Sequence, residues 1–237
     1  TRSEHVEREL GATLSALQPD GVSLTPPHSE NTQITRLLAE KGIAFARIGA
    51  TEEGPGFPLT MGDDQAAYDA TKRLIELGHR QSGFIAGPRE YSLSGWRKAG
   101  WERALNDHAL SSHGLSERGD FGYESGTLAT RALLDRNPGM TAIIGSSDQM
   151  TLAALAVARD RGLHVPRDLS LISFDNTPIV RFSQPPLTAV DQPIAETVSV
   201  AVEQLLAMGR TAKTADVTDV PAGLVERAST GPAPEEA

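Results

Sequence analysis

Apolar side chains recur along the chain in two different patterns. Where they recur every three or four residues they form one stripe of an amphipathic helix, as Val6, Leu10 and Leu14 do near the start. Such helices are predicted over residues 4–17, 31–41, 63–77, 95–106, 123–135, 149–161 and 194–208. Short continuous apolar runs predict strands over residues 22–24, 44–48, 83–86, 142–145 and 169–174.

Strands and helices alternate with short connections, and strands such as residues 83–86 and 142–145 are continuous apolar runs. Such strands are buried on both faces, which favours an α/β fold with parallel sheets covered by helices. No sequence period of about 20–50 residues recurs, so a solenoid of repeats is excluded. Residues 232–237 are rich in proline and glutamate, and we expect a disordered tail there.

The composition is that of an ordinary globular protein, with 39% apolar and 22% charged residues. There is no cysteine, which excludes disulfides and cysteine nucleophiles and suits a reducing cytoplasm. No apolar run is long enough to span a membrane, and no signal-peptide pattern opens the chain. The net charge of -9 argues against this segment gripping a nucleic-acid backbone by itself.

Polar side chains directly follow several of the predicted strands. Ser146, Ser147 and Asp148 follow one strand, Asp175 follows another and Thr25 a third. Ligands of open parallel sheets bind beyond the carboxyl ends of the strands, so these residues are candidates for a binding site. Asp148 stands directly before a helix and is either its N-cap or a ligand contact. Asp175 precedes no helix, which favours a binding role.

Other polar residues have simpler interpretations. Asp63 and Asp64 open a predicted helix, and we expect them to cap it. Arg97 lies one turn before Trp101 near the start of another helix, where an isolated arginine is typically a solvated surface residue.

Patterns of known catalytic and metal sites are missing from the sequence. There is no Gly-x-Ser-x-Gly elbow, no phosphate-binding P-loop and no His-Glu-x-x-His pair. The six histidines are scattered, and we predict neither a metal site nor a cofactor. One enzymatic alternative stays open, in which Asp148 and Asp175 are the acid and base of a glycosidase.

Eight segments, in the right order, resemble motifs of the effector-binding core of the lactose-repressor family of bacterial transcription regulators. These segments are PDGV at 19–22, RLIELGHR at 73–80, SGWRKAGW at 94–101, SDQM at 147–150, GLHVPRDLS at 162–170, SFDN at 173–176, PLTAVDQP at 186–193 and LVERAST at 224–230. Each motif alone is weak, whereas eight in order make a specific signal.

The resemblance implies two doubly wound parallel-sheet subdomains, periplasmic-binding-protein-like, joined by crossing strands. We expect residues 1–87 and about 192–221 in the N-terminal subdomain, and residues 88–191 and about 222–231 in the C-terminal subdomain. Family members begin with a helix-turn-helix headpiece, a hinge and a strand–helix–strand before the point that matches residue 1. We therefore expect the N-terminal part of the first subdomain to be missing here and the native polypeptide to extend upstream.

The family also implies a small-molecule effector in the cleft between the subdomains. Arg97 matches the arginine that clamps effector hydroxyls or a carboxylate, which suits its planar fork of donors. Asp175 matches the acidic residue that accepts from sugar hydroxyls. The further positions implied for effector binding are Ser147, where the family usually has asparagine, Asp148, Phe121 as an aromatic wall, Thr25 and Gln192. Ser173 replaces a family glycine, and we expect only local packing consequences.

The leading hypothesis is a cytoplasmic, homodimeric transcriptional repressor of sugar use that is not an enzyme and has no membrane partner. A mono- or oligosaccharide effector would shift an equilibrium between subdomain orientations and so change the fit of two absent headpieces to operator DNA. The alternatives are an exported sugar-binding protein of a transporter, which shares the fold, and the carbohydrate-active enzyme with the carboxylate pair.

Overall fold

A computed structural model of the chain describes residues 11–235 apart from 15, 53 and 209–215. The chain divides into two compact units. Unit 1 comprises Thr1–Met61 and Pro193–Pro221, and unit 2 comprises Gly62–Gln192 and Ala222–Ala237.

Unit 1 is built on a four-stranded parallel sheet. Its strands, in spatial order, are β1 (Gly21–Leu24), β2 (Ala44–Ile48), β3 (Phe57–Thr60) and β9 (Thr218–Asp219). Its helices are the short η1 (His28–Glu30), α2 (Thr32–Glu40) and α7 (Ile194–Met208). Because side chains alternate along a strand, Phe45 packs with the side chains of α2, whereas Ala46 packs with those of α7 on the other face.

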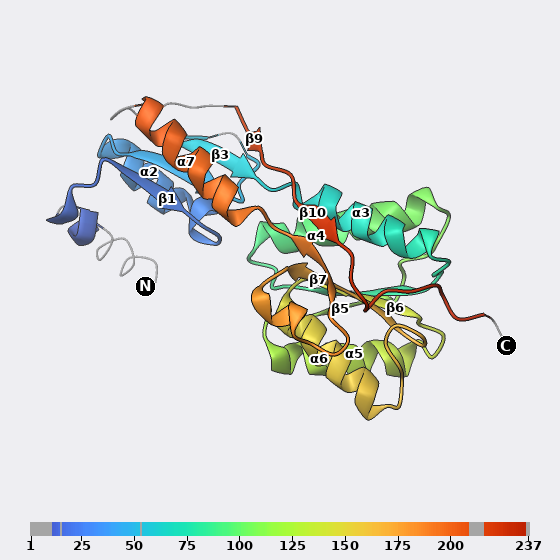
Figure 1. The fold of residues 1–237 in the computed structure, drawn as a ribbon. Coiled ribbons are helices and arrows are strands. Elements are labelled where there is room, and N and C mark those ends of the chain that lie inside the picture. The colour runs from blue at the N-terminus through green and yellow to red at the C-terminus, as the bar shows by residue number, and fades with distance from the viewer. Residues whose placement is uncertain (1–10, 15, 53, 209–215, 236–237) are drawn as a thin grey trace. The chain divides into compact units, whose positions relative to one another are not determined.

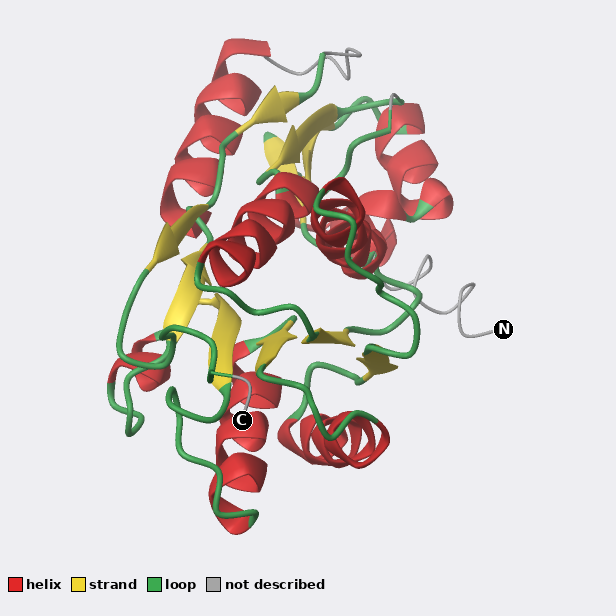
Figure 2. Ribbon diagram, turned by 90° about the vertical axis from the view of Figure 1, so that its right-hand side faces the viewer, coloured by secondary structure: helices red, strands yellow, loops and turns green. Residues whose placement is uncertain are grey.

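Unit 2 is built on a six-stranded sheet between two layers of helices (Figures 1 and 2). Its strands, in spatial order, are β10 (Gly223–Val225), β8 (Thr188–Asp191), β7 (Ser170–Asp175), β6 (Ala142–Gly145), β4 (Ser82–Ala86) and β5 (Ser116–Arg118). Helices α3 (Asp63–Glu76) and α4 (Ser92–Asp107) lie on one face of the sheet, and α5 (Tyr123–Arg136) and α6 (Asp148–Asp160) lie on the other. A short helix, η2 (Pro178–Arg181), follows β7.

The fold class predicted from the sequence is confirmed. All strand pairs are parallel except that of β10 with β8, which is antiparallel. The predicted strands and helices are found with small shifts of their ends, and the described part of the helix expected over residues 4–17 is helical. The sequence pattern missed β3, β5, β8, β9 and β10. Two of these, β5 and β9, are short edge strands without a continuous apolar run.

The strand order of unit 2 determines where a ligand site can form. From β4 the chain passes to β5 on one side and afterwards to β6 on the other, so the order reverses between β4 and β6. Crevices in open parallel sheets form at such reversals, beyond the carboxyl ends of the strands. The carboxyl ends of β4 and β6 are Ala86 and Gly145.

Helices α3 and α4 pack closely in the core of unit 2. Trp101 of α4 is fully buried and stacks on Phe84 of β4, with 5.5 Å between the ring centroids. A Cβ atom on Gly100 would lie only 1.9 Å from the backbone oxygen of Asp64, so only glycine permits this approach of the two helices. The start of α3 is thereby fixed beside α4.

The division of the chain differs from the boundary expected near residue 87. Residues 62–87 belong to unit 2, because β4 pairs with β5 and β6 and α3 packs on α4. The disordered tail expected over residues 232–237 is corrected at its start, since the amide of Ala233 donates to the oxygen of Leu77 at 2.8 Å, and residues 236–237 lie outside the described residues.

His79 lies just beyond α3 and joins distant parts of unit 2. Its ring is 1% exposed, with Nδ1 2.8 Å from Oγ1 of Thr141 and Nε2 3.1 Å from the oxygen of Gly231. Burial lowers the pKa of His79 below its ordinary value of 6.5, and the hydrogen bond to Gly231 acts in the opposite direction.

We expect the free energy of unfolding to fall as the pH drops below 6.5. In that range His79 binds a proton more readily in the unfolded chain than in the native protein, because its native pKa is lower. Urea denaturation between about pH 7.5 and 5.5 measures this slope. The variant His79→Gln, which has no ring to protonate, should be less stable near pH 7.5 and should lose less stability on acidification. An unchanged pH slope in this variant would contradict the assignment.

Candidate functional site

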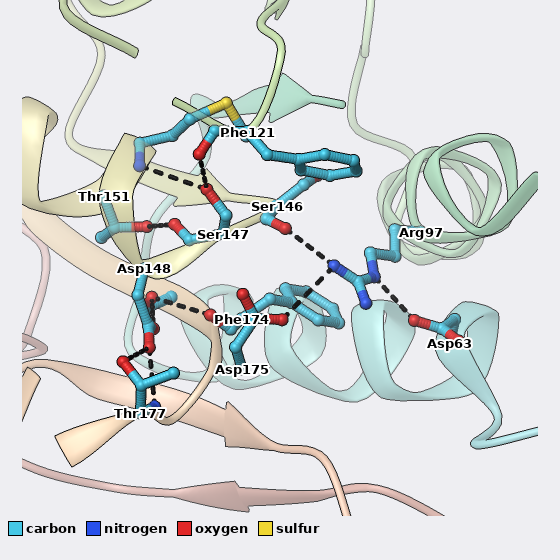
Figure 3. Close-up of polar contacts among 12 residues, drawn as sticks. Asp63, Arg97, Phe121, Ser146, Ser147, Asp148, Thr151, Phe174, Asp175 and Thr177 are labelled. Atoms are coloured by element: carbon cyan, nitrogen blue, oxygen red, sulfur yellow. Dashed lines mark hydrogen bonds and ion pairs between the residues drawn. The ribbon is translucent and has the colours of Figure 1, made fainter. Parts of the chain in front are cut away.

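A cluster of polar and charged side chains lies at the carboxyl edge of the unit 2 sheet (Figure 3). We call its members Asp63, Arg97, Ser146, Phe174 and Asp175 the Arg97 cluster. Arg97 comes from α4 and Asp63 from α3, while the other three residues lie at the ends of β6 and β7. The sheet reversal and the α3–α4 contact therefore bring these side chains together.

Arg97 is held on three sides. It is 3% exposed, and its Nε donates to Oδ1 of Asp63 at 2.6 Å. Its Nη1 donates to the backbone oxygen of Ser146 at 2.7 Å. The guanidinium carbon lies 4.4 Å from the centroid of the Phe174 ring, a cation–π contact. Nη2 has no hydrogen-bond partner among the described residues.

Asp175 faces the same guanidinium from the end of β7. Its Oδ1 lies 3.9 Å from Nη1 of Arg97, and its side chain is 35% exposed. The backbone φ of +94° is in the left-handed region that non-glycine residues rarely adopt, which indicates a strained residue held by its neighbours. Partial burial raises the pKa of this carboxyl, with Arg97 opposing the rise and Asp148 and Asp63 adding to it.

The carboxylate of Asp148 holds the turn that follows Asp175 in place by hydrogen bonds. Its Oδ1 accepts from the hydroxyl of Ser173, and its Oδ2 accepts from the amide and the hydroxyl of Thr177 at 2.7 and 2.6 Å. Asp148 is not the N-cap of α6. That position is occupied by Ser147, whose Oγ accepts from the amide of Met150 at 3.2 Å. Asp148 is therefore a bracing residue with both oxygens occupied, which also speaks against its role in a catalytic carboxylate pair. The sequence predicts only local packing consequences for Ser173, but its hydroxyl donates to Asp148 and so helps to position the carboxylate that holds the turn.

The middle residue of the turn, Asn176, is held from the other side. Its Oδ1 accepts from Nη2 of Arg227 at 2.6 Å, and its Nδ2 donates to Oδ1 of Asp191 at 2.8 Å. Arg227 also donates to the oxygen of Leu187 at 2.6 Å. The carboxyl of Asp175 thus projects from a turn that is anchored at the two residues after it, Asn176 and Thr177.

Phe121 lies beside the Arg97 cluster (Figure 3), and its role as an aromatic wall for a ligand stays a prediction. Its backbone, at φ +70°, is fixed by a 2.9 Å hydrogen bond from Oγ of Ser147 to its oxygen. Its ring meets Tyr91 edge-on at 5.5 Å. A Cβ on Gly87 would lie 2.2 Å from this ring, so the ring position requires glycine at the end of β4.

The two remaining predicted site residues occupy different places. Gln192 directly follows β8, whose residue Asp191 pairs with Asp175, so Gln192 belongs to the same edge of the sheet. Thr25 is exposed and follows β1 of unit 1. The effector-binding roles of both residues stay predictions.

Sequence reasoning missed the part that Asp63 plays. The expected cap is not formed: the N-cap of α3 is Gly62, which makes no side-chain cap, and the carboxylate of Asp63 turns to Arg97. Three buried polar atoms around the cluster accept or donate no hydrogen bond among the described residues, namely Oδ2 of Asp63 and Oγ of Ser94 and Ser146. The serine–arginine spacing in the motif at 94–101 was the only signal for Ser94 in the sequence.

The chemistry of this edge is that of a polar binding site. It offers guanidinium donors, a half-buried carboxylate acceptor and an aromatic face, which together match a ring with hydroxyl groups. Among the described residues, no group of His, Cys, Asp or Glu side chains is arranged to hold a metal ion. Within the same ranges, no helix has the length and apolar character needed to cross a membrane.

We expect Asp175→Asn to raise the melting temperature at neutral pH, because it removes a carboxylate whose ionisation the folded state resists. The destabilisation caused by the ionised carboxylate is fully present above the raised pKa of Asp175 and disappears below its ordinary value of 3.8. The gain in melting temperature should therefore shrink on acidification. Thermal unfolding from pH 7 to about pH 4 measures it. Asp120→Asn provides the contrast: hydrogen bonds from Ser125 and Gly122 lower the pKa of Asp120, so this variant should melt lower at neutral pH. A gain for Asp175→Asn that is independent of pH would contradict this account.

The chain is similar to several known regulators. The family model of the periplasmic binding protein-like domain matches residues 71–230. The chain is 33% identical to the HTH-type transcriptional regulator CelR of Thermobifida fusca over 207 residues, covering 81% of this chain and 57% of that protein. It thus spans little more than half the length of that relative.

Two solved structures have the same fold and share 30% of the sequence. One is the transcriptional regulator CelR–cellobiose complex, with a TM-score of 0.82 over 94% of this chain and 69% of that chain. The other is a regulatory protein of the LacI family from Chloroflexus aggregans, with a TM-score of 0.83 over 96% of this chain and 81% of that chain. The chain therefore belongs to the lactose-repressor (LacI) family of transcription regulators and contains its periplasmic-binding-protein-like domain.

Proposed function

We propose that the chain is the effector-sensing part of a cytoplasmic, repressor-type transcription regulator that responds to an uncharged mono- or oligosaccharide. Relatives over most of this chain are named as transcriptional regulators, and one of the similar structures holds cellobiose. These similarities do not favour the exported sugar-binding protein. They also support a role without catalysis, since the relatives are regulators and both oxygens of Asp148 are engaged.

The observation that carries this proposal is the convergence of Arg97 and Asp175 at the carboxyl edge of the unit 2 sheet, with 3.9 Å between Nη1 and Oδ1. A sugar hydroxyl both donates and accepts, so it can accept from the guanidinium and donate to the carboxylate at the same time. Phe121 supplies an apolar surface for a ring face. Ser147, Gln192 and Thr25 are further candidates for effector contacts.

Effector binding would act on DNA indirectly. The net charge of -9 makes this part of the protein a poor partner for a phosphate backbone, whereas the curated relative carries the HTH-type designation. We infer that operator DNA is bound through a headpiece outside this chain. A differential affinity of about 10–100-fold between two conformations supplies roughly 1.4–2.7 kcal/mol, enough for a useful switch.

A thermal-shift screen across neutral mono- and disaccharides tests the proposal. A sugar at about 100 times its dissociation constant adds about 2.7 kcal/mol to the free energy of unfolding, which corresponds to a rise of roughly 5–10 °C for a protein of this size. We expect Arg97→Ala and Asp175→Ala to lose this rise. The exposed charge variant Asp160→Ala serves as the control and should keep it. Normal sugar affinity of both cluster variants by calorimetry would refute the site.

We also propose that the protein is a homodimer and that unit 2 takes part through the face around η2. Ile179 and Phe182 are 57% and 84% exposed there, although they are large and apolar. A neighbouring cavity of about 380 Å³ is lined mainly by apolar side chains, among them Leu152, Leu155 and Pro185. Exposed apolar groups beside an apolar cavity are typical of a protein–protein contact.

We expect Phe182→Glu to weaken dimerisation by at least about tenfold, because a charge would then be buried in an apolar contact. Analytical ultracentrifugation measures the change in dissociation constant. Leu128 on α5 is 69% exposed, and Leu128→Glu should leave the dimer intact. Equal dimer stability in the two variants would place the contact elsewhere.

A further inference from the structure

The carboxylate of Asp63 pairs with Arg97 and is not the N-cap of α3. Gly62 caps α3 with a left-handed φ of +61°, and the side chain of Asp63 is only 1% exposed. Its Oδ1 accepts from Nε of Arg97 at 2.6 Å. The chain itself therefore supplies a buried counter-charge to the guanidinium that faces the proposed effector site.

The counter-charge changes which ligands the guanidinium can attract. A buried guanidinium without a partner would favour an anion, because charge-assisted hydrogen bonds are about twice as strong as neutral ones and a buried unpaired charge is costly. Once Asp63 neutralises Arg97, a ligand carboxylate or phosphate gains little from it. The Nη groups still offer directional N–H donors to a hydroxyl oxygen.

The remaining charged side chains at this edge of the sheet also disfavour anionic ligands. Asp175 lies 3.9 Å from Arg97 on the side away from Asp63, and Asp148 lies behind the turn that carries Asp175. The charges of Asp148 and Asp63 both raise the pKa of Asp175, so they act at the carboxyl that faces a ligand. A second guanidinium, that of Arg118, donates to the oxygen of Gly87 at 2.5 Å. Even with Arg118 included, carboxylates outnumber guanidiniums, and an anionic ligand would enter an excess of negative charge.

We propose that Asp63 is a specificity-determining residue, which neutralises Arg97 and thereby selects uncharged, hydroxyl-bearing effectors over sugar acids and phosphate esters. The inference rests on the proposed effector site, since it assigns the charge class of the ligand that this site takes. Oδ2 of Asp63 is buried and accepts no hydrogen bond among the described residues, so the charge of this carboxylate is directed at Arg97 and not at a second partner.

Matched sugar pairs that differ only by a carboxylate test this proposal by calorimetry on the 237-residue chain. Suitable pairs are glucose with glucuronate and galactose with galacturonate. The wild type should bind the neutral member of a pair at least about tenfold more tightly than the acid. Asp63→Asn keeps an acceptor for Nε but removes the charge, and should shift this ratio towards the acid by about tenfold or more.

Asp64→Asn is the matched control, because it makes the same change of charge one residue away. Asp64 is half-exposed and lies 3.7 Å from Arg103 instead of Arg97, so the ratio should stay that of the wild type. An unchanged ratio in Asp63→Asn overturns the proposal. If Asp63→Asn does not fold, the wild-type ratio decides, and equal binding of sugar and acid overturns the proposal.

Inorganic phosphate separates this inference from the proposed function. If no sugar pair binds the wild type, the proposed sugar response fails, but the charge role of Asp63 is still measured by phosphate titration. Phosphate should then bind to Asp63→Asn and not to the wild type or Asp64→Asn. The absence of phosphate binding to Asp63→Asn in that case overturns the inference as well.

Discussion

The buried guanidinium of Arg97 is the constraint around which the carboxyl edge of unit 2 is arranged. A charge that is 3% exposed needs partners, and it finds Asp63, the backbone oxygen of Ser146 and the ring of Phe174. These partners come from α3, from the end of β6 and from β7. Losing the carboxylate of Asp63 or the oxygen of Ser146 would leave a desolvated donor unpaired, and losing the Phe174 ring would remove the cation–π contact.

A second set of interactions keeps Asp175 in a conformation that it would not adopt by itself. Its φ of +94° is strained, and the neighbouring Asn176 is also left-handed at +54°. Thr177 is tied to Asp148, and Asn176 is tied to Arg227 and Asp191, so the strain is distributed over three neighbouring elements. A carboxyl that is strained and partly desolvated costs stability, and such a cost is common where a side chain is kept ready to bind.

Much of the fold follows from local patterns, while the pairing within the site does not. Largely apolar runs such as those of β4 and β6 identify buried parallel strands, and Arg97 and Asp175 stand in motifs that can be matched by sequence. Asp63 could not be found in this way, because its partner is 34 residues distant and depends on the close approach of α3 and α4 at Gly100. The expected boundary near residue 87 failed for a similar reason, since only pairing between distant strands assigns β4 to unit 2.

A crystal structure of the protein with the sugar that raises its melting temperature most would test the central claim directly. We expect sugar hydroxyl oxygens within hydrogen-bond distance of both the Arg97 guanidinium and the Asp175 carboxylate, with the Nε of Arg97 still bonded to Asp63. A sugar bound away from this edge, or an Arg97 side chain that has left Asp63 to reach the sugar, would contradict it.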